Sequence, residues 1–131
     1  MLGDRRLREQ LEIIKTRRFS QFCMSVGNMR LAFWGDHLGA IGREILIEHP
    51  TLELSRPGQP ASTYERGNDV VAASLLSVLD HAVVSIDVTG GCLTIVFDGG
   101  LQVVVEPDQR YESWQISSEA FGRWRVRTVN S

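Results

Sequence analysis

Two pairs of carboxylates in this chain have a spacing that could serve general acid–base chemistry. Glu44 and Glu48 lie four residues apart, and Glu106 and Asp108 lie two apart. Such chemistry requires both groups in one pocket, where their surroundings push their pKa values apart. Neither pair stands in a motif that would build such a pocket, so we expect no catalytic residues in this protein.

Histidines and cysteines, the other side chains that could do chemistry, are scattered. A metal site requires several ligands at short spacing, whereas His37, His49 and His81 form no HxH or HExxH pattern. Cys23 and Cys92 lie far apart in apolar segments, and we expect them to be buried, reduced thiols. The sequence also has no GxSxG elbow, no phosphate-binding glycine loop and no dinucleotide fingerprint. We therefore expect no metal ion, no cofactor and no enzymatic activity.

Charge is distributed unevenly along the chain. The net charge of the whole chain is −2, but between residues 19 and 122 thirteen acidic residues stand against five basic ones. An acidic surface attracts a basic partner and speeds its approach, although a surface that serves only solubility would carry the same residues. We expect partner contacts to come from the acidic set Asp36, Glu44, Glu48, Glu53, Glu65, Asp98, Glu106 and Asp108.

Basic residues gather at the two ends of the chain. Six of them lie within residues 1–18, and Arg123, Arg125 and Arg127 alternate along the last expected strand. Such residues could follow the phosphates of a nucleic acid. Trp124 alternates with the arginines, however, and is expected to point inward instead of stacking on bases. We expect no nucleic-acid partner, and a housekeeping interaction module that uses the arginine face stays open as a further alternative.

Hydrophobic periodicity predicts the elements that position these residues. An N-terminal helix over 4–17 carries Leu7, Leu11 and Ile14 on one face. A first β unit over 19–55 begins with a hairpin that turns at Gly27-Asn28. The segment 68–79 is apolar nearly all round, so we expect a helix buried at the centre of the core. A meander of antiparallel strands over 82–128 closes the chain.

The elements add up to one domain over residues 1–131, in which residues 1–18 form the N-terminal helical segment. We expect an α+β fold with a mainly antiparallel, curved sheet, one buried helix and the N-terminal helix. The turn-rich segment 56–67 is expected to be a surface loop. No stretch has the roughly twenty apolar residues that span a membrane, and MLGDRRLREQ has no apolar core of a secretory signal. We expect no membrane partner and a cytoplasmic location.

An aromatic group near the C-terminus leaves two interpretations open. Trp114 and Ile116 alternate with polar residues, as in a half-buried strand, and Tyr111 and Glu112 lie just before it. These aromatic side chains could pack in the core. The alternative is a small-ligand-binding or enzymatic domain with a pocket near Tyr111, Glu112 and Trp114.

The same region carries a resemblance to a known family. The segment LTIVFDGGLQVVVEPDQRYESWQI, over residues 93–116, resembles the F-x-D-G-x-L hairpin, the V-x-P step and the Y-E-x-W pattern of a family of small, uncharacterised bacterial proteins, a domain of unknown function. The resemblance covers roughly residues 19–116, and the C-terminal FGRWRVRT departs from it. It implies an immunity protein of a bacterial toxin system, such as contact-dependent growth inhibition. The implied partner is a cognate toxin domain, for which a basic nuclease is one candidate.

Overall fold

The computed structural model describes residues 2–34, 42–108, 113–117 and 125–128. The two helices are α1 (Leu2–Lys15) and α2 (Asp69–Leu76). The ten strands are β1 (Arg18–Met24), β2 (Met29–Trp34), β3 (Arg43–Ile47), β4 (Thr51–Ser55), β5 (Ser62–Glu65), β6 (Val83–Thr89), β7 (Cys92–Phe97), β8 (Gln102–Val105), β9 (Trp114–Ser117) and β10 (Arg125–Thr128). The α+β class, expected from the sequence, is confirmed. No helix in the described part of the chain is long and apolar enough to cross a membrane.

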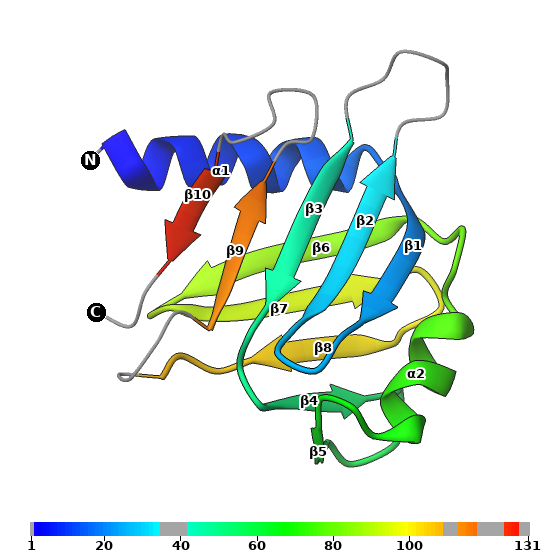
Figure 1. Ribbon diagram of the computed structural model, residues 1–131. Coiled ribbons are helices and arrows are strands. Elements are labelled where there is room, and N and C mark those ends of the chain that lie inside the picture. Colours follow the sequence, from blue (N-terminus) through cyan, green and yellow to red (C-terminus); the bar gives the residue numbers. More distant parts are fainter. Residues whose placement is uncertain (1, 35–41, 109–112, 118–124, 129–131) are drawn as a thin grey trace.

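The strands form two antiparallel sheets instead of one curved sheet. The first sheet has the order β1-β2-β3-β9-β10 and the second the order β5-β4-β8-β7-β6. The strands of one sheet run steeply across those of the other (Figure 1), as in orthogonal sheet packing. The expected meander holds for β6, β7 and β8. It is wrong for the C-terminal strands, because β9 pairs with β3 and β10 with β9, in the first sheet.

The core lies between the two sheets, because each strand alternates buried and outward-facing side chains. The rings of Phe19 and Phe33 in the first sheet lie 5.6 Å apart between centroids, and Phe19 lies 5.2 Å from Phe97 in the second. All three side chains are fully buried. The contact between Phe19 and Phe97 joins the two sheets. Tilted ring pairs of this kind add to the stability that burial supplies.

Helix α1 closes one edge of the sandwich. It runs beside β6 and across the ends of strands in the first sheet (Figure 1). On the inner face of α1, Leu11 and Ile14 are buried and Leu7 packs against the core, which confirms the predicted apolar face. The helix starts and ends two residues earlier than the predicted bounds of 4–17.

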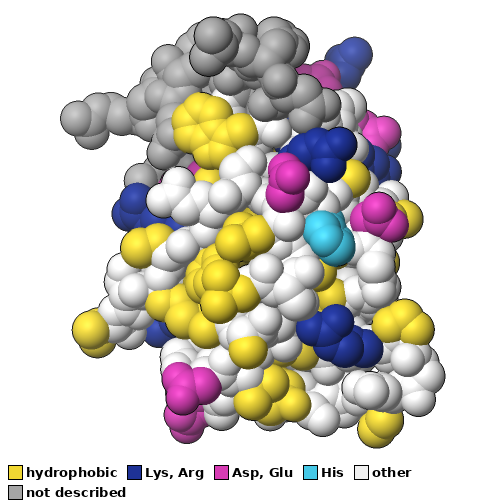
Figure 2. All heavy atoms as spheres, turned by 90° about the vertical axis from the view of Figure 1, so that its right-hand side faces the viewer, with side chains coloured by type: hydrophobic (Ala, Val, Ile, Leu, Met, Phe, Trp, Pro, Cys, Tyr) yellow, Lys and Arg dark blue, Asp and Glu magenta, His cyan; other side chains and the backbone are white. Residues whose placement is uncertain are grey.

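Helix α2 begins where the sequence predicts but is not the centre of the core. Asn68 is the N-cap, and its side chain accepts a hydrogen bond from the backbone N–H of Val70 at 2.8 Å. Only Val71 and Leu75 are buried, whereas Val70 is 44% and Leu76 59% exposed. The helix lies at one end of the sandwich, beside β4 and β5 (Figure 1). Hydrophobic side chains accordingly reach the surface at this end of the molecule (Figure 2).

The segment 56–67, expected to be a loop, contains β5, which pairs with β4 through Leu52 and Tyr64 and the flanking residues. Its short length and polar composition hid this edge strand from a search for hydrophobic alternation. A cleft lies between α2 and the β4–β5 pair.

Candidate functional site

The outward face of the second sheet carries the largest group of predicted contact residues. In β4, Leu52 and Leu54 are buried, whereas Thr51, Glu53 and Ser55 are half-buried and lie on the opposite face. This alternation follows from the period-two geometry of a strand. The polar positions of β4 therefore look outward, away from the first sheet.

Strand register gathers three glutamates on that face. Glu65 of β5 pairs with Thr51, and Glu53 pairs with Val104 of β8. Glu106 directly follows β8 and is the next outward position after Val104. Glu65, Glu53 and Glu106 therefore belong to β5, to β4 and to the end of β8, three neighbours in the sheet. Adjacent strands lie about 4.8 Å apart. We call Glu53, Glu65 and Glu106 the acidic face.

The acidic face has little basic charge to balance it. None of the outward-facing strand positions that the structure describes in the second sheet is Lys, Arg or His. Arg66 directly follows Glu65, and its guanidinium donates to the backbone carbonyls of Val26, Glu48 and His49. At the β6 edge, Asp87 is close enough to α1 to act on Lys15. The pKa of Lys15 is raised there, chiefly by its 2.9 Å hydrogen bond with Glu12, and in part by the charge of Asp87.

The half-buried thiol of Cys92 reports the negative charge of this face. Its pKa is raised, first by burial and then by the charge of Glu106, with a further contribution from Glu53. Cys92 is the first residue of β7, and a hydrogen bond with the side chain of Glu106 raises the pKa of the thiol further. A nearby negative charge disfavours the thiolate, so Cys92 is less reactive than an isolated thiol.

The other members of the predicted acidic set lie elsewhere. Glu44 and Glu48 belong to the first sheet: Glu44 lies 3.8 Å from Arg30, and Glu48 accepts a hydrogen bond from Gln115 at 3.0 Å. Asp98 is exposed in the turn between β7 and β8, at the opposite end of this hairpin from Glu106. The structure thus brings Glu53, Glu65 and Glu106 together, and it places Glu44, Glu48 and Asp98 elsewhere. Of the remaining two, the half-buried Asp108 follows β8, and Asp36 lies outside the described residues.

The aromatic segment is partly described. Trp114 is fully buried, and its indole N–H donates to the carbonyl of Gly91 at 3.0 Å. It therefore belongs to the core and not to the rim of a pocket. Tyr111 and Glu112, the other two residues of the predicted ligand site, lie outside the described part of the chain. The same holds for Arg123, whereas Arg125 and Arg127 belong to β10.

Histidines and cysteines do not converge. Within the described ranges, no three His, Cys, Asp or Glu side chains lie close enough together to hold a metal ion. The ring of His49 contacts the backbone N–H of Thr51 at 3.1 Å, and the ring of His81 contacts the carbonyl of Asp98 at 2.7 Å. The prediction that both cysteines are buried is wrong, because Cys23 is exposed on the edge strand β1 and Cys92 is only half-buried.

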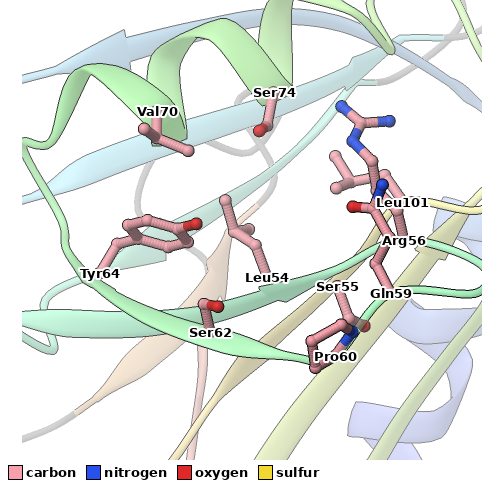
Figure 3. Close-up of a pocket in the computed structure, with 10 residues that line it drawn as sticks. All are labelled: Leu54, Ser55, Arg56, Gln59, Pro60, Ser62, Tyr64, Val70, Ser74 and Leu101. Carbon is pink, nitrogen blue, oxygen red and sulfur yellow. The ribbon is translucent and has the colours of Figure 1, made fainter.

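A cleft between α2 and the β4–β5 pair was not predicted from the sequence. Arg56, Tyr64 and Ser74 line it, together with Leu54 and Leu101 at its floor. The only sequence signal was the Pro57-Gly58 pair, which indicates a tight turn but not the space beside it. Figure 3 shows the side chains converging from the helix, the strands and the connecting loop.

Comparison with known proteins gives a family without a function. The model of the Family of unknown function (DUF6188) matches residues 27–124 of this chain. Searches of the curated proteins and of the solved structures find no significant match. The matched region includes eight of the ten strands, β2 to β9, together with α2, and leaves out α1, β1 and β10. Because the match spans most of the chain, the protein belongs to the DUF6188 family of unknown function.

Proposed function

We propose that this protein is an immunity protein that binds and neutralises a cognate bacterial toxin domain. It catalyses no reaction in this role and acts in the cytoplasm, where a toxin domain arrives. The partner presents a basic surface, as a nuclease that binds nucleic acid does. The proposal combines the sequence resemblance with one structural observation, the acidic face.

The acidic face supports the proposal because its charge is concentrated and held on rigid elements. Glu53 and Glu65 stand on strands and Glu106 follows one, so their positions are fixed by the ladder of the second sheet. Fixed charges of one sign steer a partner of the opposite sign and raise its association rate by about ten- to a thousandfold. A rapid and specific encounter is what neutralisation of a toxin requires.

The half-buried Glu53 and the exposed Glu65 and Glu106 also favour a protein partner over a metal ion. Among the residues that the structure describes, no three His, Cys, Asp or Glu side chains could hold a metal ion together, and these carboxylates form a broad negative surface. A rim of such charges sets association rate and salt dependence more than the final affinity. The area needed for a stable complex, about 800 Å² per partner, would extend beyond these three residues to the polar positions around them.

A growth-rescue assay tests the proposal. A candidate toxin domain, sought in the genes that neighbour this chain's gene, is expressed in a bacterial host with or without the protein. Rescue by the wild-type chain, together with co-purification of the two proteins, is the expected result. Absence of both rescue and co-purification would refute the proposed function.

A matched pair of variants tests the surface. Glu53→Lys combined with Glu106→Lys reverses two charges of the acidic face and should abolish or strongly weaken rescue. The control combines Glu9→Lys on α1 with Asp98→Lys in the β7–β8 turn, which changes the net charge equally at exposed positions elsewhere. Rescue by the control should equal that of the wild type. If both double variants rescue equally, toxin neutralisation does not use this face.

A further inference from the structure

The cleft between α2 and the β4–β5 pair has the size of a small-molecule site. Its volume is about 320 Å³, at the lower end of the range for ligand pockets. At roughly 30 Å³ for each water-sized group, it has room for about ten non-hydrogen atoms. The cleft lies on the inner side of β4 and β5, so it is separate from the acidic face.

One wall and the floor of the cleft are apolar. Leu54 and Leu101 are buried to within a few per cent at its floor. Val70 of α2 stands above them, with its side chain 44% exposed. The ring of Tyr64 closes the end opposite Arg56, and its hydroxyl points toward the middle (Figure 3). An aromatic ring or a short aliphatic chain would bury apolar surface here.

The polar end of the cleft is a half-buried arginine. Arg56 Nη2 donates to the hydroxyl of Ser77 at 3.0 Å, and this hydroxyl in turn donates to the carbonyl of Ser74 at 2.6 Å. No Asp or Glu is among the described residues that line the cleft. No carboxylate in the described part of the chain forms an ion pair with Arg56. A guanidinium carries five N–H donors, so donors of Arg56 stay available for an anion.

Contacts within the protein hold the loop that carries Arg56 in one conformation. The backbone N–H of Gln59 donates to the carbonyl of Arg56 at 3.0 Å, and Gly58 has a φ of +76°. Pro followed by Gly with positive φ is the pattern of a type II turn. The ring of Pro57 packs directly on Gly100, in the turn between β7 and β8. A preformed site loses less free energy on binding than one that must be ordered.

We propose that this cleft binds a small organic anion of about ten non-hydrogen atoms, in which an apolar body carries one carboxylate. The body lies on Leu54 and Leu101 between Val70 and Tyr64, and the carboxylate accepts hydrogen bonds from Arg56. The hydroxyls of Ser62 and Ser74 supply further donors at the walls. The assignment does not depend on the proposed immunity function, because it uses a different surface.

A titration followed by the backbone amide resonances tests the site. The probes are phenylacetate and hexanoate, with phenylacetamide as the neutral counterpart. The expected result is saturable shifts confined to residues 54–64, 70–77 and 99–101, with the amide binding about tenfold more weakly than phenylacetate or worse. If neither carboxylate gives saturable shifts in these segments, or the amide binds as well as phenylacetate, the assignment is wrong.

Variants separate a ligand-binding arginine from a structural one. Arg56→Gln removes the charge and should weaken phenylacetate binding by about ten- to a hundredfold, the value of a hydrogen bond to a charged group. Ser77→Ala removes the partner of Arg56 but keeps its charge, and should change affinity less than about threefold. Arg30→Gln, on the first sheet, is the control and should leave affinity unchanged.

Filling the cleft gives an independent measurement. Ser74→Leu places a larger side chain in the cleft from a helix position and leaves Arg56 intact. Binding should be lost while the thermal unfolding midpoint is kept or raised, because leucine is a good helix former. If Ser74→Leu or Arg56→Gln binds phenylacetate as tightly as the wild type, the ligand does not occupy this cleft.

Discussion

Replacing Gly100 by alanine should destabilise the protein through two separate effects. Gly100 has a φ of +96°, which an L-residue adopts only with strain. A Cβ at this position would also lie 2.4 Å from Cγ and 2.7 Å from Cδ of Pro57, which is far inside van der Waals contact. The strain costs about 2 kcal/mol, and displacement of the proline ring about 2 kcal/mol more. We expect Gly100→Ala to lower the free energy of unfolding by about 4 kcal/mol.

The neighbouring Gly99 provides a matched control. Its φ of +102° gives the same backbone strain, but a Cβ there would meet only His81, at 3.6 Å, which is ordinary contact. Gly99→Ala should therefore cost about 2 kcal/mol. The difference between the two variants, measured by urea denaturation, reports the clash with Pro57.

A double-mutant cycle checks the cause. Pro57→Ala removes the two ring atoms that a Cβ on Gly100 would meet, so the double variant should be about 2 kcal/mol more stable than the sum of the single effects predicts. The reasoning is refuted if Gly100→Ala costs no more than Gly99→Ala, or if the two substitutions are additive. Either result would show that the loop is not anchored on this turn.

Three further predictions concern the core, a helix cap and the acidic face. Trp114→Phe should cost about 1–3 kcal/mol, because the carbonyl that now accepts from the buried indole N–H loses its partner; chemical denaturation measures the loss. Asn68→Ala should lower stability by about 1 kcal/mol, and Asn68→Asp by only a few tenths, because aspartate also caps α2. Glu106→Gln should lower the raised pKa of Cys92 by removing a negative charge, so alkylation should become faster at mildly alkaline pH. A Cys23→Ser background isolates this reaction, and an unchanged pH–rate profile would contradict the assignment of Glu106.

Local patterns predicted the elements well where they depend on neighbours in sequence. The spacing of Leu7, Leu11 and Ile14 predicted the buried face of α1, and Asn68 predicted the start of α2. The predicted burial of α2 at the centre of the core was wrong, because an apolar run of residues cannot show whether strands or solvent face each side of the helix. In the structure the two sheets supply the core, and α2 covers only one end of it.

The division into two sheets could not be read from the sequence. Pairing of β9 with β3 joins Trp114 to Ile47, residues far apart in the chain. Hairpin signals reveal only pairings between strands that follow one another in sequence. The predicted meander therefore wrongly included β9 and β10. For the same reason the predicted acidic residues could not be assigned to faces: Glu53 and Glu106 meet through the β4–β8 pairing, which no local pattern encodes.

The association rate of the cognate toxin domain with this protein tests the central claim most directly. Surface plasmon resonance at low and at moderate salt compares the wild type with Glu53→Lys/Glu106→Lys and with the control Glu9→Lys/Asp98→Lys. We predict that reversal of the acidic face slows association at low salt by about tenfold or more. It should also flatten the salt dependence, while the control stays within about twofold of the wild type. Equal association rates for the two double variants would contradict a basic partner docking on Glu53, Glu65 and Glu106.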